Sequence, residues 1–218
     1  MLDFWVYLHI LLLVFWVGTD LGVFLAARYS ERTELSFETR QTVLQLGMIL
    51  DRLPRSALVL IIPTGVMIAM EYRWLILPAW SVTTIWSAAL LWLLILWQGF
   101  LSANPEVQAL CAKINWWLNL VAAGGAVTWG LVMAFDPVVP FWLALKVIMV
   151  GGIFTVGFIL DLLFTPAMRL FAQLSTDPDN KGLNQSYTKA LGPVYLTVVA
   201  IYILALTAAA LGVFKLPI

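Results

Sequence analysis

Long apolar runs, separated by short polar segments, dominate the pattern of hydrophobic and polar positions along this 218-residue chain. The runs are continuous rather than alternating, which favours α-helices and excludes the strands of a membrane barrel. Each run is near the roughly 20 residues that a helix needs to cross a bilayer. The pattern therefore predicts an all-α, integral membrane helical bundle of about six spans. We place the spans at residues 4–27, 56–72, 82–101, 116–135, 138–164 and 191–214.

The polar segment before the second span predicts a further stretch of helix outside the membrane. Residues 37–50 have the spacing of an amphipathic helix, and we expect this helix to continue into the second span without a break. Pro54 is expected to kink it or to start its embedded part. Residues 176–185 have the composition of a loop. Because no internal repeat is evident, we expect a single transmembrane domain over residues 1–218.

The composition agrees with a lipid environment. Hydrophobic residues make up 62% of the chain and charged residues 11%, with a mean hydropathy of +0.96. A soluble domain of this size cannot bury so much apolar surface. The formal net charge is zero, which argues against a nucleic-acid partner. The single cysteine, Cys111, excludes an internal disulfide and a thiolate metal cage.

The basic residues predict how the spans are oriented. Arg73 and Lys215 lie on one predicted side and nine of the twelve basic residues on the other. Those nine are Arg28, Arg32, Arg40, Arg52, Arg55, Lys113, Arg169, Lys181 and Lys189. Since basic loops stay in the cytoplasm, both termini are predicted on the periplasmic or exterior side. The first run is too long for a signal peptide and is expected to remain as a span. We predict a multi-pass protein of the bacterial cytoplasmic (inner) membrane.

His9, the only histidine, and Lys146 lie inside apolar runs, where an ionisable group is costly and marks a functional site. In the predicted topology both lie roughly 10 Å below the same membrane face. Met67, Met70 and Met149 are predicted in the same half of the bundle. Imidazole and thioether are ligands of haem iron and Cu(I), so these side chains are candidate ligands. Packing methionines, a hydrogen-bonded histidine and a lysine that reaches the interface are the structural alternatives.

A second polar group is predicted near the other membrane face. Asp20 is about three helical turns beyond His9, roughly 16 Å along the same helix face. Asp161 is predicted in the part of the fifth span that is nearest this face. Arg52 and Arg55 lie where the second span begins. A carboxylate in lipid needs a cation, and Arg52 or Arg55 is the expected partner of Asp20. The group is either a structural ion pair, a proton path or a clamp for an anionic group.

The tryptophans and small residues predict packing. Trp142 lies near a span end, as in an aromatic belt. Trp16 is deeper, where it would either line a planar ligand or pack in the core. The series of Ala122, Ala126 and Gly130 predicts a close helix contact, as do Gly151 and Gly157. Close contacts of this kind decide which spans are neighbours.

Three short patterns together resemble a group of small bacterial membrane proteins. They are His9–Trp16–Gly18, Arg52 and Arg55 with Pro63-Thr64-Gly65, and Trp142–Lys146. The group contains the haem-dependent protoporphyrinogen IX oxidases and the copper-resistance D membrane domain, and the resemblance covers roughly residues 1–165. It implies a helical bundle that holds haem, with His9 as a candidate ligand. It further implies that Lys146 and the two arginines contact substrate or haem propionates.

The chain departs from those oxidases at one position. They carry a further histidine just after the first helix, where this chain has Tyr29-Ser30. With one histidine, two imidazoles from a single chain cannot hold the iron. Haem would then need His9 with a methionine or lysine, a five-coordinate iron, or a partner protein.

These expectations combine in one hypothesis, with two alternatives. The protein would bind haem, porphyrin or copper between the first, second and fifth spans and serve a redox step as a membrane oxidoreductase, with quinone or another membrane protein as electron partner. His9 would be the metal ligand and Lys146 the second ligand or an acid–base group, with protons relayed by Asp20, Arg55 and Asp161. The remaining cofactor-binding candidates are Trp16, Arg52, Met67, Met70, Trp142 and Met149. The alternatives are a non-catalytic subunit of a larger membrane complex and a small transporter.

Overall fold

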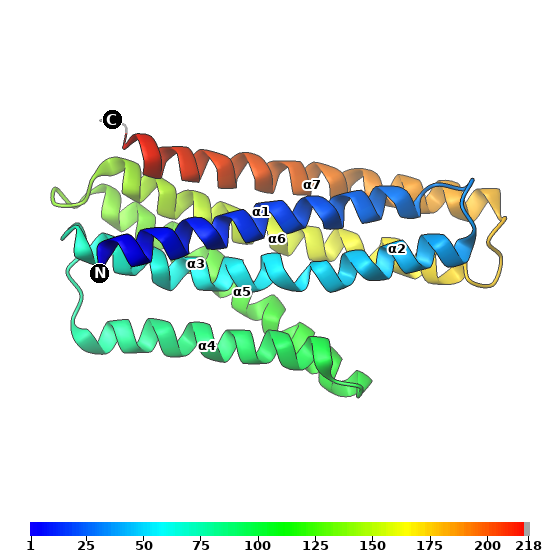
Figure 1. Ribbon diagram of the computed structural model, residues 1–218, viewed down its shortest axis with the longest axis horizontal. Coiled ribbons are helices and arrows are strands. Elements are labelled where there is room, and N and C mark those ends of the chain that lie inside the picture. Colours follow the sequence, from blue (N-terminus) through cyan, green and yellow to red (C-terminus); the bar gives the residue numbers. More distant parts are fainter. Residues whose placement is uncertain (216–218) are drawn as a thin grey trace.

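The computed structural model describes residues 1–215, which form helices joined by short connections and contain no strand (Figure 1). The helices are α1 (Leu2–Ser30), α2 (Phe37–Leu50), α3 (Arg52–Glu71), α4 (Ala79–Leu101), α5 (Pro105–Ala134), α6 (Phe141–Gln173) and α7 (Lys181–Phe214). Six helices are long and apolar enough to cross a membrane when α2 and α3 are taken together. The predicted all-α bundle of six membrane helices is therefore confirmed.

Several helices are longer than the predicted spans. α5 begins at Pro105, α6 continues to Gln173, and α7 begins at Lys181 inside the predicted loop. Asparagine side chains cap two of these beginnings: Asn104 accepts from the backbone N–H of residue 106, and Asn180 from that of residue 183. Helical hydrogen bonding continues through polar sequence once an end is capped, so the apolar runs mark the embedded parts and not the helix ends.

The amphipathic segment and the second span are two helices, which corrects the expectation of one unbroken helix. α2 ends at Leu50 and α3 begins at Arg52, with Asp51 in a turn between them. Pro54 explains the break, because it has no N–H to donate to the carbonyl of Leu50. The two helices still run in one direction, so the break at Asp51 does not reverse the chain (Figure 1).

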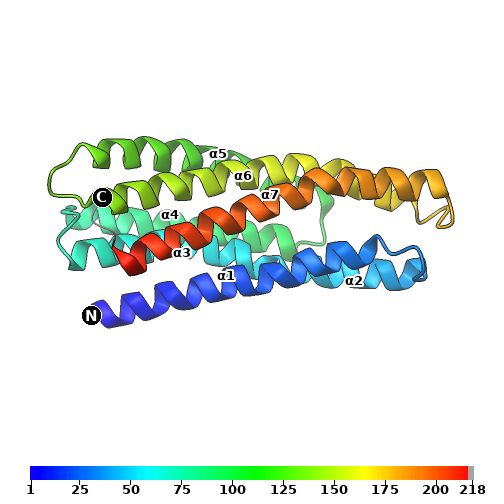
Figure 2. The same ribbon diagram turned by 90° about the horizontal axis from the view of Figure 1, so that it is seen from above.

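The helices form two groups that lie side by side along the bundle (Figure 2). α1, α2 and α3 make one group, and α5, α6 and α7 make the other. α4 packs on both α3 and α5, and α1 meets α7. The backbone of α3 does not approach α6 closely, so side chains fill the space between them. Both the beginning of α1 and the end of α7 lie at one end of the bundle (Figure 1).

α5 and α6 are in backbone contact at two glycines. A Cβ on Gly130 would lie 2.9 Å from the backbone nitrogen of Ile148, and one on Gly151 would lie 2.9 Å from that of Val127. The close contacts predicted for Gly130 and Gly151 are thus confirmed. Gly157 has open space where a Cβ would be, so the contact predicted there was wrong. This backbone contact lies in the half of the two helices that is nearer the termini.

The opposite end of the bundle extends beyond α4 and α5 (Figure 1). There α2, the last turns of α6 and the first turns of α7 share an apolar core that includes Leu44, Phe171 and Tyr187. Arg40 is buried in this extension and donates from Nε to the carbonyl of Ser30 over 2.7 Å. The Ser30 hydroxyl lies 2.6 Å from that of Tyr187. These bonds hold the end of α1 against α2 and α7.

An apolar layer crosses the middle of the bundle and joins the two groups. It brings together α1, α3, α6 and α7. Its buried members are Trp16, Ala57, Ile61, Ile153, Ile201 and Ala205. The polar side chains of the interior lie on either side of this layer.

Candidate functional site

His9 is held by α3 through a hydrogen bond that defines which ring nitrogen is free. Its Nδ1 lies 2.9 Å from the hydroxyl oxygen of Thr64. That hydroxyl donates its one hydrogen to the carbonyls of Leu60 and Ile61, at 3.1 and 3.0 Å. We therefore assign the hydroxyl as the acceptor from Nδ1–H of His9, a tautomer that leaves the lone pair on Nε2. A neutral imidazole with this tautomer is prepared to bind a metal through Nε2.

Two glycines make room for His9 and Lys146. A Cβ on Gly65 would lie 3.2 Å from Cε1 of His9, so the ring rests directly on α3. A Cβ on Gly212 would lie 2.8 Å from Nζ of Lys146, so the ammonium rests directly on α7. His9 thus connects α1 to α3, and Lys146 connects α6 to α7. We call His9, Thr64, Gly65, Lys146 and Gly212 the His9 site.

The charge of Lys146 is not compensated by a nearby carboxylate. Within residues 1–215 the ion pairs involve Arg28 and Arg55, and none includes Lys146. The ammonium lies close enough to the His9 ring for the two groups to interact electrostatically. The His9 site therefore combines an imidazole with an amine that has no carboxylate partner among residues 1–215.

Aromatic side chains pack together where α3 ends and α6 begins, and we call this group the aromatic cover. Trp142 is buried and packs edge-on against Trp74, with ring centroids 5.1 Å apart. Trp74 stacks on Tyr72 at 4.3 Å, and the Lys215 ammonium lies 4.6 Å from the Tyr72 ring centroid. Trp142 is therefore part of an aromatic cover rather than an isolated belt residue.

The methionines singled out from the sequence lie on the helices of the His9 site. Met67 and Met70 are half-buried in the last turns of α3, beyond Thr64, and Met149 is half-buried in α6, one turn beyond Lys146. Within residues 1–215, no three His, Cys, Asp or Glu side chains come together as a metal site. The candidate donors are consequently the imidazole, the amine and the thioethers.

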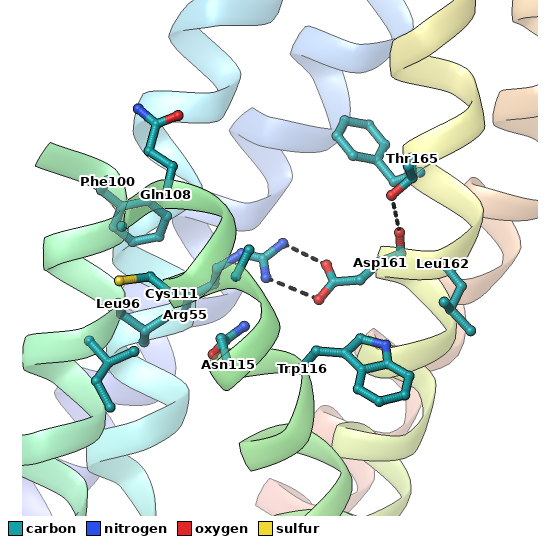
Figure 3. Close-up of a pocket in the computed structure, with 14 residues that line it drawn as sticks. Arg55, Leu96, Phe100, Gln108, Cys111, Asn115, Trp116, Asp161, Leu162 and Thr165 are labelled. Carbon is teal, nitrogen blue, oxygen red and sulfur yellow. Dashed lines mark hydrogen bonds and ion pairs between the residues drawn. The ribbon is translucent and has the colours of Figure 1, made fainter. Parts of the chain in front are cut away.

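Arg55 forms the strongest ion pairs, on the other side of the apolar layer. Its Nε donates to Asp51 over 2.6 Å, and its Nη2 donates to Asp161 over 3.0 Å (Figure 3). Nη1 approaches the second oxygen of Asp161 at 3.5 Å, so the contact is nearly bidentate. We call Asp51, Arg55 and Asp161 the Arg55 cluster. It joins α3 to α6, whose backbones do not meet.

Asp20 is not the ion-pair partner of either arginine, which corrects the sequence-based expectation. Arg55 is already engaged by two carboxylates, and the Arg52 guanidinium lies 5.5 Å from the Phe100 ring centroid. Asp20 instead lies beside the buried hydroxyl of Tyr202 on α7, without a hydrogen bond of good geometry to it. The physical reason is proximity: Asp51 precedes Arg55 by one helical turn and competes successfully for it.

The apolar layer separates Asp20, Arg55 and Asp161 from His9. Trp16 is 6% exposed and packs within this layer, in agreement with its core-packing alternative. Ile61 of α3 and Ala205 of α7 are buried in the same layer. A chain of polar side chains from the cluster to His9 is therefore interrupted in this structure.

A cleft of about 450 Å³ opens beside the Arg55 cluster, between α4, α5 and α6 (Figure 3). Asn115 and Gln108 of α5 line it together with Arg55 and Asp161, and Trp116 forms one wall. We call it the Arg55 cleft. The sequence analysis did not single out Asn115, Gln108 or Trp116 as site residues.

Sequence reasoning missed the groups that complete both polar regions. From the sequence, Thr64 was named only as part of the Pro63-Thr64-Gly65 pattern. A hydroxyl next to a proline inside a span could have marked it as a candidate site residue. Asp51 stands four residues before Arg55, which is the spacing of a helical ion pair. Gly212 and Tyr202 left no signal, because only the packing of α7 against α6 and α1 brings them into place.

Comparisons with protein-family models, curated proteins and solved structures found no match to this chain. The fold defines its class: an all-α bundle with six helices that are long and apolar enough to cross a membrane.

Proposed function

We propose that this membrane protein binds a haem or related porphyrin at the His9 site and serves a redox step. Copper held by His9 and methionine thioethers is the runner-up within the same proposal. The observation that carries it is the hydrogen bond between Nδ1 of His9 and Thr64, since the tautomer assigned from it leaves Nε2 to bind a metal. An imidazole held in this way by a second-shell group is the usual protein ligand of haem and copper.

The donor set fits a single axial imidazole. Haem, when bound, supplies one-electron chemistry that no side chain of this chain provides. His9 would hold the iron, and Gly65 would keep the ring close to α3. Lys146 would be a second ligand or would bind an anionic group such as a propionate, because its ammonium has no carboxylate partner within residues 1–215. Trp142 and the aromatic cover would exclude water.

The proton path differs from the one suggested by the sequence. Asp20, Arg55 and Asp161 lie beyond the apolar layer, so in this proposal they do not pass protons to His9. A proton would reach Lys146 from the end of the bundle where the termini lie. The excess of basic residues at the opposite end supports a periplasmic or exterior position for that end and a place in the bacterial inner membrane.

An absorption spectrum with metal analysis of the purified protein tests the proposal. We expect a Soret band, or stoichiometric copper, that disappears in His9→Ala and weakens or shifts in Lys146→Met. Tyr7→Ala is the matched control, because Tyr7 is on the same helix and 65% exposed. A colourless, metal-free preparation would refute the proposal, and a stoichiometric partner retained in mild detergent would then favour a non-catalytic subunit.

A further inference from the structure

The Arg55 cleft exists because α5 and α6 diverge. The two helices are in backbone contact at Gly130 and Gly151, but further along Trp116 meets Phe158 with ring centroids 4.6 Å apart. Beyond that aromatic pair, α5 runs with α4 instead of α6 (Figure 1). The cleft opens where the helices diverge, and the exposed Ala112 and Leu162 stand at its mouth.

One side chain in the cleft has hydrogen-bond donors with no partner among residues 1–215. The Trp92 indole N–H donates to Oδ1 of Asn115 over 2.9 Å, and Trp92 is itself stacked on Phe154. Because an indole only donates, the oxygen of Asn115 must face Trp92. The amide nitrogen of Asn115 therefore points the other way, toward the space beside Asp161 (Figure 3).

The charges of the cleft favour an uncharged ligand. Arg55 pairs with Asp51 and Asp161, and a second guanidinium, that of Arg52, lies 5.5 Å from the ring centroid of the cleft residue Phe100. The side chains of Arg55 and Asp161 are 31% and 27% exposed, so they can still be reached by hydrogen-bonding groups. Neither an anion nor a cation gains a net electrostatic advantage here.

We propose that the Arg55 cleft binds the ring of an uncharged, lipid-soluble carbonyl compound of the quinone class. Asn115 and Arg55 donate to the carbonyl oxygens, and Trp116 and Phe100 contact the ring. The volume is within the range of small-molecule pockets, about 300–1,000 Å³. The apolar mouth lets the ring enter from lipid while its tail stays outside. This site deepens the proposed function by giving the electron partner a place separate from the His9 site.

The single cysteine provides the test, because Cys111 lines the cleft. The rate at which methyl methanethiolsulfonate modifies Cys111 is measured by mass spectrometry in nanodiscs, with and without decylubiquinone. We expect decylubiquinone to slow the reaction and decylbenzene, which has a tail and ring but no carbonyl, to leave it unchanged. If Cys111 is unreactive in the free protein, the same measurement is made on the C111A/A112C variant.

Two variants and a control locate the effect. Ala112→Phe fills the mouth and should abolish protection, whereas Val121→Phe places the same side chain on an exposed position of α5 and should not. Asn115→Leu should weaken decylubiquinone binding about tenfold, as expected for one lost hydrogen bond. Equal protection by decylbenzene, no protection by decylubiquinone, or an unchanged affinity in Asn115→Leu would each overturn the proposal.

The protection of Cys111 by decylubiquinone should not depend on whether the cofactor is bound at the His9 site. His9→Ala should lose the Soret band yet keep protection of Cys111 by decylubiquinone. If protection fails while the Soret band is present, the cleft proposal alone is wrong. If protection holds in a colourless protein, the His9 proposal alone is wrong.

Discussion

The His9 site and the Arg55 cluster lie in one apolar bundle but satisfy their polar groups in opposite ways. Arg55 has two carboxylates at 2.6 and 3.0 Å, so its charge is compensated within the protein. His9 has one neutral hydroxyl as partner, and Lys146 has no carboxylate within residues 1–215. A buried charge without a partner is costly, and proteins rarely keep one without a use. The difference explains why we place the cofactor at His9.

The apolar layer makes the two regions separable by experiment. The apolar side chains of Trp16, Ile61 and Ile201 stand between them. A substitution on one side should therefore leave the other side intact.

Arg55→Met should destabilise the protein by about 3 kcal/mol, because it leaves two carboxylates without their cation inside the bundle. The measurement is the heat-denaturation midpoint in detergent. Arg28→Met is the control, since the Arg28 side chain is 56% exposed and 3.5 Å from its partner Glu31. The double variant R55M/D161N should recover part of the loss. Equal midpoints for the two single variants would show that the cluster contributes no more than a surface pair.

Gly130→Ala should destabilise the protein by about 2 kcal/mol through overpacking. The added Cβ would lie 2.6 Å from Cγ1 of Ile148 and 3.0 Å from the carbonyl oxygen of Ala144, and the backbone atoms cannot move aside. Gly124→Ala, on the same helix, meets nothing within 4 Å and should be neutral or slightly stabilising. A neutral Gly130→Ala would mean that α5 and α6 are less closely packed near the His9 site than described.

Thr64→Val should cost about 1 kcal/mol in stability, since His9 Nδ1–H loses its acceptor at nearly constant side-chain volume. In the cofactor-loaded protein, the affinity for the cofactor should fall about tenfold, as is usual when the partner of a ligating histidine is removed. Thr64→Ser keeps the hydroxyl and should restore both properties. A cofactor affinity that follows side-chain volume rather than the hydroxyl would contradict the assigned tautomer.

The smallest effect expected is the coupling between the two regions. The changes in unfolding free energy for His9→Ala and Asp161→Asn should add to within about 0.5 kcal/mol in the double variant. Denaturation of the four proteins under one condition gives the coupling energy. A coupling well above this value would show that the apolar layer does not isolate His9 from the cluster.

The helical class and the number of membrane helices were predictable because lipid imposes one rule on every span. Backbone groups in a bilayer must bond within their own helix, so each continuous apolar run becomes a helix. The ends were not predictable in the same way: α5 begins at Pro105 and α7 at Lys181, because capped helices continue outside the lipid. The break at Asp51 depends on Pro54. The sequence predicted that Pro54 would kink the helix or start its embedded part, but not that two separate helices would form.

The sequence predicted which ionisable residues lie inside the bundle better than it predicted the groups that they contact. Ionisable residues in apolar runs pointed to His9, Asp20, Lys146 and Asp161, but not to the groups each would meet. Arg55 and Asp161 are 106 positions apart in the chain, and Asp20, which looked like the natural partner of an arginine, lies beside Tyr202. Local spacing could have suggested Asp51, whereas nothing local suggested Tyr202.

By itself, the order of residues determined that this chain is a helical membrane bundle and which few side chains would be expensive to embed. Only the packing of the helices decided that Thr64 directs the His9 proton, that Gly212 receives the Lys146 ammonium, and that an apolar layer separates them from Arg55. The physical reason is that burial is a property of each run, whereas hydrogen bonds and ion pairs reach only about 3 Å. Which atoms come within that distance depends on how the helices cross.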